Sequence, residues 1–240
     1  MQASYTYSLC ESNGDSVLAS LSGNSPTLYG NPLNREYDKS RCSYNATNVF
    51  RLNALYNLPF HQNRLVSGWQ ITAIWSASSG LPFNVTDGPD MTNQLNVATG
   101  RPNYAPNNPA VTVNGVSYPA CNNSPIVGSA GLWFNPNCFT QQAFGTLGNF
   151  GREGLIGPGL TSVDMAILKT TKLTEKMTLQ FRAEFFNIFN HTNLGLPTAT
   201  VFTGTASPTA MLTYNTASAG QITTAAVPSR EIQFGLKLIF

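Results

Sequence analysis

The amino-acid sequence predicts an all-β chain, an antiparallel up-and-down transmembrane β-barrel segment of about six long strands, open or incomplete, with long loops. Three observations predict this fold class. Apolar and polar residues alternate in six segments, and helical periodicity is almost absent. Only 10% of the 240 residues are charged, against roughly 25% in a typical soluble domain. Long and short connections between the segments alternate, as they do in membrane barrels.

The first three predicted strands lie before residue 78. Residues 3–9 alternate tyrosine and leucine with serine and threonine. Residues 48–58 alternate large apolar side chains with arginine and asparagine. After a polar turn, residues 65–77 alternate leucine, tryptophan, isoleucine and alanine with glutamine, threonine and serine. Two faces of such opposite character place a strand between an apolar and a wet environment.

The last three predicted strands follow the same pattern. Residues 162–172 alternate less strictly, because Leu168 joins the polar side. A short polar turn then leads into residues 177–189, as a hairpin requires. The final strand, residues 230–240, carries its apolar side chains on one face and ends in phenylalanine. The side chains of this C-terminal strand signal are Phe234, Leu236, Leu238 and Phe240.

Three long connections, over residues 11–47, 80–161 and 191–229, are rich in Asn, Pro, Gly, Ser and Thr. Structureless connections of this length argue against a compact soluble domain. We interpret the glycines between residues 148 and 159 as flexible loop residues, since no lysine follows where a phosphate loop needs one. In a membrane barrel the long loops are extracellular, and the short turns and the C-terminus are periplasmic.

Several function classes are disfavoured by composition. A net charge of +2 is too small to indicate a nucleic-acid partner. No stretch approaches the roughly 20 apolar residues of a transmembrane helix. The first ten residues contain neither the basic nor the apolar segment of a signal peptide, so we expect an export signal upstream of Met1 and a chain that is a fragment.

The four cysteines form two pairs along the chain. Cys10 and Cys42 bracket the first long connection, and Cys121 and Cys138 lie within the second. Their spacings fit no zinc site. Our hypothesis is two loop-closing disulfides formed in the oxidising periplasm, with free thiols as the alternative.

The sequence predicts no enzyme, and no catalytic, cofactor-binding or metal-binding residue. His61 and His191 have no partner pattern around them and are interpreted as solvated polar residues. The turn that contains Asp87 and Asp90 offers two carboxylates, too few to predict a calcium site.

Polar residues on one predicted strand, Gln180, Arg182 and Glu184, share its lumen-facing side. We expect them to form an ion-pair and hydrogen-bond network inside a barrel. The alternative is contact with a plug domain or with a passing solute. Aromatic residues such as Trp69 and Trp75 lie on the opposite, lipid-facing side, as in the aromatic girdles of barrels.

Four parts of the sequence carry a family resemblance: residues 68–70 with 79–83, the pair 163–164, the run FRAEFFNIFNH at 181–191, and the terminal run QFGLKLIF at 233–240. They resemble the C-terminal part of TonB-dependent outer-membrane receptors, in particular the large ones with an N-terminal carboxypeptidase-regulatory-like domain. The chain departs from that family at residues 45–48, where an Asp-Arg-His cluster is usual and Asn-Ala-Thr-Asn stands here.

The resemblance implies a plugged barrel of about 22 strands that imports a scarce nutrient ligand with energy from TonB. All of residues 1–240 would be the C-terminal part of that barrel, inactive alone, with plug and TonB contact before Met1. Implied partners are outer-membrane lipid, the remainder of the barrel and its plug, TonB through the missing N-terminal part, and the barrel-assembly machinery through the C-terminal strand. The implied location is the outer membrane of a Gram-negative bacterium.

Two alternatives stay open at this point. One is a small self-contained barrel or porin, with extra strands around residues 110–118 and 198–214. The other is a secreted carbohydrate-binding or adhesin β-domain, a soluble module whose strands also alternate. If the chain is instead a barrel fragment, residues 3–9 and 230–240 are exposed sheet edges, which invite aggregation.

Overall fold

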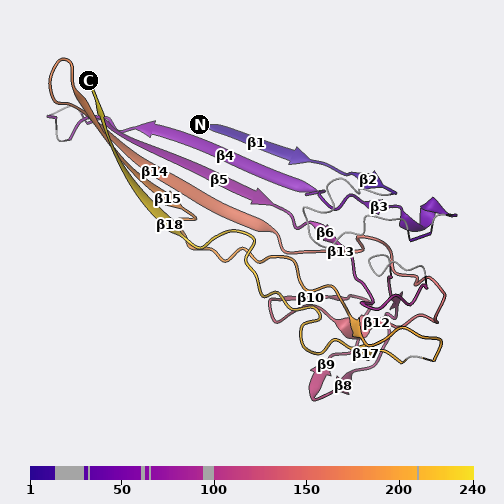
Figure 1. Cartoon of the computed structure of the whole chain (residues 1–240). Coiled ribbons are helices and arrows are strands. Elements are labelled where there is room, and N and C mark those ends of the chain that lie inside the picture. The colour runs from indigo at the N-terminus through magenta and orange to yellow at the C-terminus, as the bar shows by residue number, and fades with distance from the viewer. Residues whose placement is uncertain (14–29, 32, 61–62, 65, 94–99, 210) are drawn as a thin grey trace.

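Six long strands form one antiparallel sheet in the computed structural model of the chain (Figure 1). They lie in the order β1-β4-β5-β14-β15-β18, so each strand pairs with its neighbours along the meander. The structure describes residues 1–13, 30–31, 33–60, 63–64, 66–93, 100–209 and 211–240. The bounds of the six strands are β1 Gln2–Tyr7, β4 Asn48–Asn57, β5 Trp69–Ser78, β14 Leu160–Lys172, β15 Thr178–Phe186 and β18 Glu231–Ile239.

All six predicted strands are confirmed, and their ends differ by a few residues. The predicted strand at 65–77 begins at Trp69 in the structure, and Leu65 lies outside the described residues. The predicted strand at 177–189 ends earlier, at Phe186. The next residue, Asn187, has φ of 48°, a left-handed conformation that asparagine tolerates and that ends an extended strand.

The sheet is open. Strands β1 and β18 form its two edges, and no other strand of the described residues pairs with their outer sides. Every residue of β18 is exposed. The predicted exposed edges are therefore confirmed.

The shorter elements gather at one end of the sheet, away from the C-terminus (Figure 1). They belong to the connections after β1, β5 and β15, whose described parts we call the loop body, at residues 8–47, 79–159 and 187–230. Their bounds are β2 Glu11–Ser12, β3 Ser40–Arg41, β6 Pro82–Phe83, β7 Asn103–Tyr104, β8 Val111–Val113, β9 Val116–Tyr118, β10 Ile126–Ser129, β11 Leu132–Phe134, β12 Phe139–Thr140, β13 Leu155–Ile156, β16 Phe202–Thr203 and β17 Thr213–Tyr214, with 3-10 helices η1 Arg35–Asp38 and η3 Pro136–Cys138.

The loop body has its own hydrophobic core, so the expectation of structureless connections is wrong. Widely spaced aromatic residues meet there, with the rings of Phe134 and Phe139 at 5.9 Å and those of Phe139 and Phe150 at 4.9 Å. Aromatic side chains bury a large apolar area each, which compensates for a polar composition. The buried members of the core are Phe83, Val85, Cys121, Phe134, Cys138, Phe139, Leu155, Ala199, Val201 and Phe202.

Backbone hydrogen bonds join the second and third connections inside the loop body. Thr86 pairs with Thr200 in a parallel bridge, and the Val201 amide donates to the Thr86 carbonyl at 2.9 Å. The extra strands proposed around 110–118 and 198–214 form only the short pairs β8–β9 and β16–β17 in this body. They do not lengthen the main sheet, which contradicts that form of the small-barrel alternative.

Two of the glycines between 148 and 159, Gly148 and Gly157, are held tightly, contrary to the expectation of flexible loop residues, whereas a Cβ atom on Gly151 would meet nothing within 4 Å. A Cβ atom on Gly148 would lie 1.9 Å from the carbonyl oxygen of Arg101. The amide of Gly157 donates to the Leu81 carbonyl at 2.8 Å, and a Cβ atom there would lie 2.5 Å from Leu196. Glycine is needed at position 148 because backbone segments approach closely there. At Gly157 the close atom belongs to the Leu196 side chain.

Among the described residues, the structure contains no helix with the length and apolar character needed to cross a membrane.

Candidate functional site

Strand register brings most of the large apolar residues of the six strands onto one face of the sheet, with Leu55, Ile74 and Leu168 among the exceptions. Residues directly opposite each other in antiparallel strands point to the same side. One row crosses five strands in this way, through Tyr56, Ile71, Ile167, Ala183 and Phe234. We call this side the apolar face. Its large side chains include Tyr5, Phe50, Leu52, Trp69, Trp75, Val163, Met165, Leu179, Phe181, Phe185, Ile232, Leu236 and Leu238.

No second layer of described residues covers the apolar face. Trp75 is 41% exposed, Tyr56 60% and Leu236 71%. The hydrophobic core contains no residue of the six long strands. A soluble sandwich would bury these side chains between two layers, so the structure argues against the secreted β-domain alternative.

The opposite side, the polar face, contains the three polar residues predicted on β15. Arg182 Nη2 lies 2.6 Å from Glu184 Oε1, and Gln180 lies opposite Lys237 of β18. Gly235 lies opposite Arg182. The Arg182 side chain is 56% exposed, and in water an ion pair this exposed contributes about 0–1 kcal/mol.

One lysine lies on the apolar face and was not predicted as a functional residue. Lys169 lies opposite Trp69, and its ammonium is 5.3 Å from the centre of that ring. Its Nζ donates to the carbonyl of Arg64 at 3.0 Å and to that of Ser67. The backbone of the β4–β5 turn therefore takes up this charge at the edge of the apolar face. The sequence signal for this residue is a lysine at a position of β14 where the alternation otherwise places apolar side chains.

A groove runs along the polar face where the strands meet the loop body. Three adjoining cavities of about 160, 320 and 120 Å³ share the lining residues Ser78, Leu160, Ser162 and Val227 between them. Charged groups line two of these cavities, Arg51 on β4 the first and Asp164 with Glu231 the second. The groove is mostly apolar with a few charged groups, which suits a small amphipathic solute.

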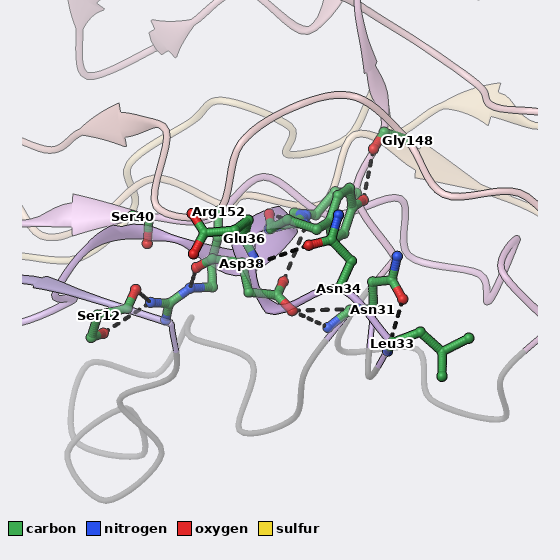
Figure 2. A network of polar contacts seen from close by, with 12 residues as sticks. Ser12, Asn31, Leu33, Asn34, Glu36, Asp38, Ser40, Gly148 and Arg152 are labelled. Carbon is green, nitrogen blue, oxygen red and sulfur yellow. Dashed lines mark hydrogen bonds and ion pairs between the residues drawn. The ribbon is translucent and has the colours of Figure 1, made fainter.

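Two buried arginines of the second connection hold the first connection in place. Arg101 Nη2 lies 3.2 Å from Asp38 Oδ1, and both side chains are almost fully buried. Figure 2 shows Arg152 between Ser12 and Asp38, where Nε donates to the Asp38 carbonyl and Nη2 to the Ser12 carbonyl, both at 2.8 Å. The other Asp38 carboxylate oxygen accepts from the Gly30 amide at 2.8 Å.

Tyr37 completes this contact between the two connections. The Arg101 guanidinium lies 4.0 Å from the centre of its ring, a cation–π arrangement. Its hydroxyl donates to the Gly148 carbonyl at 2.6 Å. We call Tyr37, Asp38, Arg101 and Arg152 the loop latch. The sequence offered only a weak signal for the loop latch. Charged residues are scarce in these connections, so the few that occur there stand out.

A second buried polar group lies within the second connection. Asp87 is fully buried, and its Oδ2 accepts from Gln142 Nε2 at 2.6 Å. Asp87 Oδ1 and Gln142 Oε1 have no hydrogen-bond partner, and neither has the amide of buried Asn84. Burial raises the pKa of Asp87 to about 7; the Gln142 hydrogen bond opposes this rise and the nearby Asp90 charge adds to it.

Both cysteine pairs of the disulfide hypothesis are joined in the structure. Cys10 and Cys42 close the first connection, with Cα atoms 5.4 Å apart. Cys121 and Cys138 lie in the core of the loop body, with Cα atoms 5.0 Å apart.

The other sequence candidates lie apart from one another. His191 follows β15 at the junction with the loop body. Its backbone amide donates to Asn187 Oδ1 at 3.0 Å. His61 lies outside the described residues. Within the described ranges, no three His, Cys, Asp or Glu side chains gather as metal ligands would. Phe234, Leu236 and Leu238 lie on the apolar face at the β18 edge, and exposed Phe240 follows the strand.

Comparison with known proteins decides the family. The model of the outer membrane beta barrel domain matches residues 1–233. The chain belongs to this family. No curated protein and no solved structure matches it.

As an outer membrane beta barrel domain, the protein is an outer-membrane barrel protein. Five of the six strands of the sheet are long enough for this setting, and β1, with 6 residues, is shorter. A strand that spans a bilayer at a tilt has about 9–11 residues, and β4, β5, β15 and β18 have 10, 10, 9 and 9. β14 has 13.

Proposed function

We propose that this chain supplies C-terminal strands of the barrel of a TonB-dependent outer-membrane receptor, which imports a nutrient ligand. The observation that carries the proposal is the pairing of the two most receptor-like segments. The FRAEFFNIFNH run forms most of β15, and the QFGLKLIF run forms most of β18. These neighbouring strands pair along nine residues, in an outer membrane beta barrel domain.

In this proposal the apolar face contacts lipid and the polar face lines the lumen. Outer-membrane barrels have an apolar outer band and a polar interior, and the register separates the residues of this sheet in that way. Gln180, Arg182 and Glu184 are then lumenal. The loop body is extracellular, and the C-terminus is periplasmic.

The remainder of the receptor closes the barrel. Six strands are fewer than the eight of the smallest closed barrels, and both edges of this sheet offer unpaired backbone groups. Further strands of the same receptor pair with the unpaired backbone groups of β1 and β18. The terminal strand, with Phe240 after it, is the segment offered to the barrel-assembly machinery.

The chain has no catalytic role in this proposal. The groove on the polar face, which Arg51 and Glu231 help to line, lies where an incoming solute passes from the loop body into the lumen. Ligand capture and energy coupling require the plug and the TonB contact of the whole receptor.

An antibody against the loop body tests the proposal in the native bacterium. The polypeptide that the antibody isolates from outer membranes is sequenced by mass spectrometry. In a second experiment the protein is photo-crosslinked to TonB in living cells before isolation. We expect a longer polypeptide with a plug, and a crosslink that requires it. A native polypeptide of 240 residues without a TonB crosslink would contradict the proposal and favour a porin.

A further inference from the structure

The groove on the polar face contains charged groups of both signs on different strands. Arg51 of β4 lines one cavity, and Asp164 of β14 and Glu231 of β18 line the adjoining cavity of about 320 Å³. Ser162 and Val227 line both cavities. The guanidinium of Arg51 and the carboxylate of Glu231 form no hydrogen bond or ion pair with any described residue. The groove therefore offers a positive and a negative group to a ligand.

The Asp164 carboxylate is held in a fixed orientation. Its Oδ1 accepts from the backbone amide of Asn187 at 2.8 Å and from Ser162 Oγ at 3.3 Å. Its Oδ2 accepts from no described residue. A carboxylate oxygen of this kind accepts from N–H groups of a ligand. Because the other oxygen is bound to the backbone, the ligand meets a carboxylate that is already oriented.

Strand register gives the distance between the positive and the negative group. Arg51 lies opposite Ser76, and Ser76 lies opposite Ser162. Asp164 follows two residues further along β14. With strands about 4.8 Å apart and about 3.3 Å per residue, the Cα atoms of Arg51 and Asp164 are about 12 Å apart. The two side chains shorten this gap, which matches an extended peptide of two or three residues, about 7–10 Å long.

Apart from its charged groups, the groove is lined by apolar side chains and hydroxyl groups. Val49, Leu160 and Phe186 line it from the strands, and Val227 lines it from the third connection. The hydroxyl groups belong to serines of β5 and β14 and of the third connection. A peptide has apolar side chains and backbone amide groups between its charged termini, so it complements this lining.

We infer that the groove binds a short zwitterionic peptide of two or three residues, with its carboxylate on Arg51 and its ammonium on Asp164. Glu231 adds negative charge to the cavity that receives the ammonium. The inference rests on the proposed function, since it names the class of solute that passes from the loop body into the lumen. Guanidinium–carboxylate and ammonium–carboxylate hydrogen bonds are stronger than those between neutral groups. An acidic sugar would use Arg51 and leave Asp164 without a positive partner.

Titration of the protein in detergent micelles with four probes tests the site. The first probe is alanyl-valyl-alanine with both termini free. The second and third are the same peptide with an N-acetyl or a C-amide group, and the fourth is glucuronate, an acidic sugar. Isothermal titration calorimetry is expected to give one saturable free peptide per chain. Each blocked peptide and glucuronate are expected to bind at least tenfold more weakly.

Two substitutions assign the termini to their partners. Arg51→Gln is expected to bind the free peptide and its C-amide equally. Asp164→Asn keeps the oxygen that accepts from the Asn187 amide and is expected to bind the free and the N-acetyl peptide equally. Lys237→Gln is the matched control, because it removes a cation from the polar face outside the three cavities. It is expected to bind all four probes as the wild type does.

Absence of saturable binding of the free peptide to the wild type overturns the inference. Equal binding of the blocked peptides, or tighter binding of glucuronate, also overturns it. If a variant fails to fold, the four probes on the wild type decide. Binding is measured without TonB, so a missing TonB crosslink contradicts the proposed function, whereas missing peptide binding contradicts this inference alone.

Discussion

At the scale of single residues, a few buried charges determine how the connections pack. Asp38 is 2% exposed and accepts from backbone amides, from Arg101 and, through its carbonyl, from Arg152. Each partner comes from a different part of the chain. Removing one member leaves a buried charge without compensation, which is more costly than the intact pair is stabilising.

Asp38→Asn is therefore expected to destabilise the loop body by about 3–5 kcal/mol, because Arg101 loses its counter-charge. Hydrogen exchange of the amides of residues 33–47, together with thermal denaturation, measures this. Glu36→Gln is the control, since Glu36 is exposed on the same 3-10 helix and should change stability by less than about 0.5 kcal/mol. Equal effects of the two substitutions would refute the latch.

Asp87 predicts a pH dependence of the stability of the protein. Its pKa is raised by burial from 3.8 to about 7. The folded state therefore holds this proton more tightly than the unfolded state, so this group's contribution to stability is largest below pH 4 and declines as pH rises toward 7. Thermal midpoints should fall more over this range for the wild type than for Asp87→Asn. If the midpoints of the wild type and of Asp87→Asn changed with pH in parallel, the raised pKa of Asp87 would be contradicted.

At the scale of elements, the difference between the apolar and the polar face of each strand is the feature most relevant to function. Neighbouring residues of β14 point to opposite faces, with Ala166 on the polar face beside Glu184 and Ile167 on the apolar face beside Ala183. One strand thus offers two positions at nearly the same depth in different environments.

Lysine substitutions at these two positions are expected to differ sharply. Ile167→Lys places a charge near the middle of the apolar face and should cost about 2–4 kcal/mol in a bilayer. Ala166→Lys faces the wet side and should cost roughly 1 kcal/mol or less. Urea unfolding from lipid vesicles measures both. A larger loss for Ala166→Lys would invert the assignment of the faces.

Both disulfides belong to the connections rather than to the long strands. Counting thiols in denatured, non-reduced protein is expected to give none, and four would remove the disulfide hypothesis. Replacing Cys121 and Cys138 by serine should cost about 3 kcal/mol, because the bond joins residues 17 positions apart and closing a loop of about 15 residues removes that much conformational entropy from the unfolded chain. Thermal denaturation of the variant measures the loss.

The long strands could be predicted from sequence because alternation is a local property. The row through Tyr56, Ile71 and Phe234 requires only that each strand keep its period of two. The loop body could not be predicted, since its contacts join residues far apart in sequence. Tyr37 meets Gly148 across 111 positions, and Arg152 meets Asp38 across 114. The connections are rich in Asn and Gly, so their composition gave no indication of the hydrophobic core that a few separate aromatic residues form in the loop body.

At the scale of the whole molecule, an open sheet with an uncovered apolar face adjoins a loop body that packs around a core of its own (Figure 1). The two parts divide the roles. In our proposal the sheet supplies the surface that a membrane covers, and the loop body holds most of the buried polar groups and both disulfides.

Quenching of tryptophan fluorescence by lipids brominated in their acyl chains tests the membrane assignment most directly. The chain has three tryptophans, so variants that retain one can be compared in the same vesicles. Trp75 is on the apolar face, whereas the indole of Trp133 donates to the Ile156 carbonyl in the loop body. We predict strong quenching in the variant that retains only Trp75 and little in the variant that retains only Trp133. An unquenched Trp75, or equal quenching of both, would contradict it.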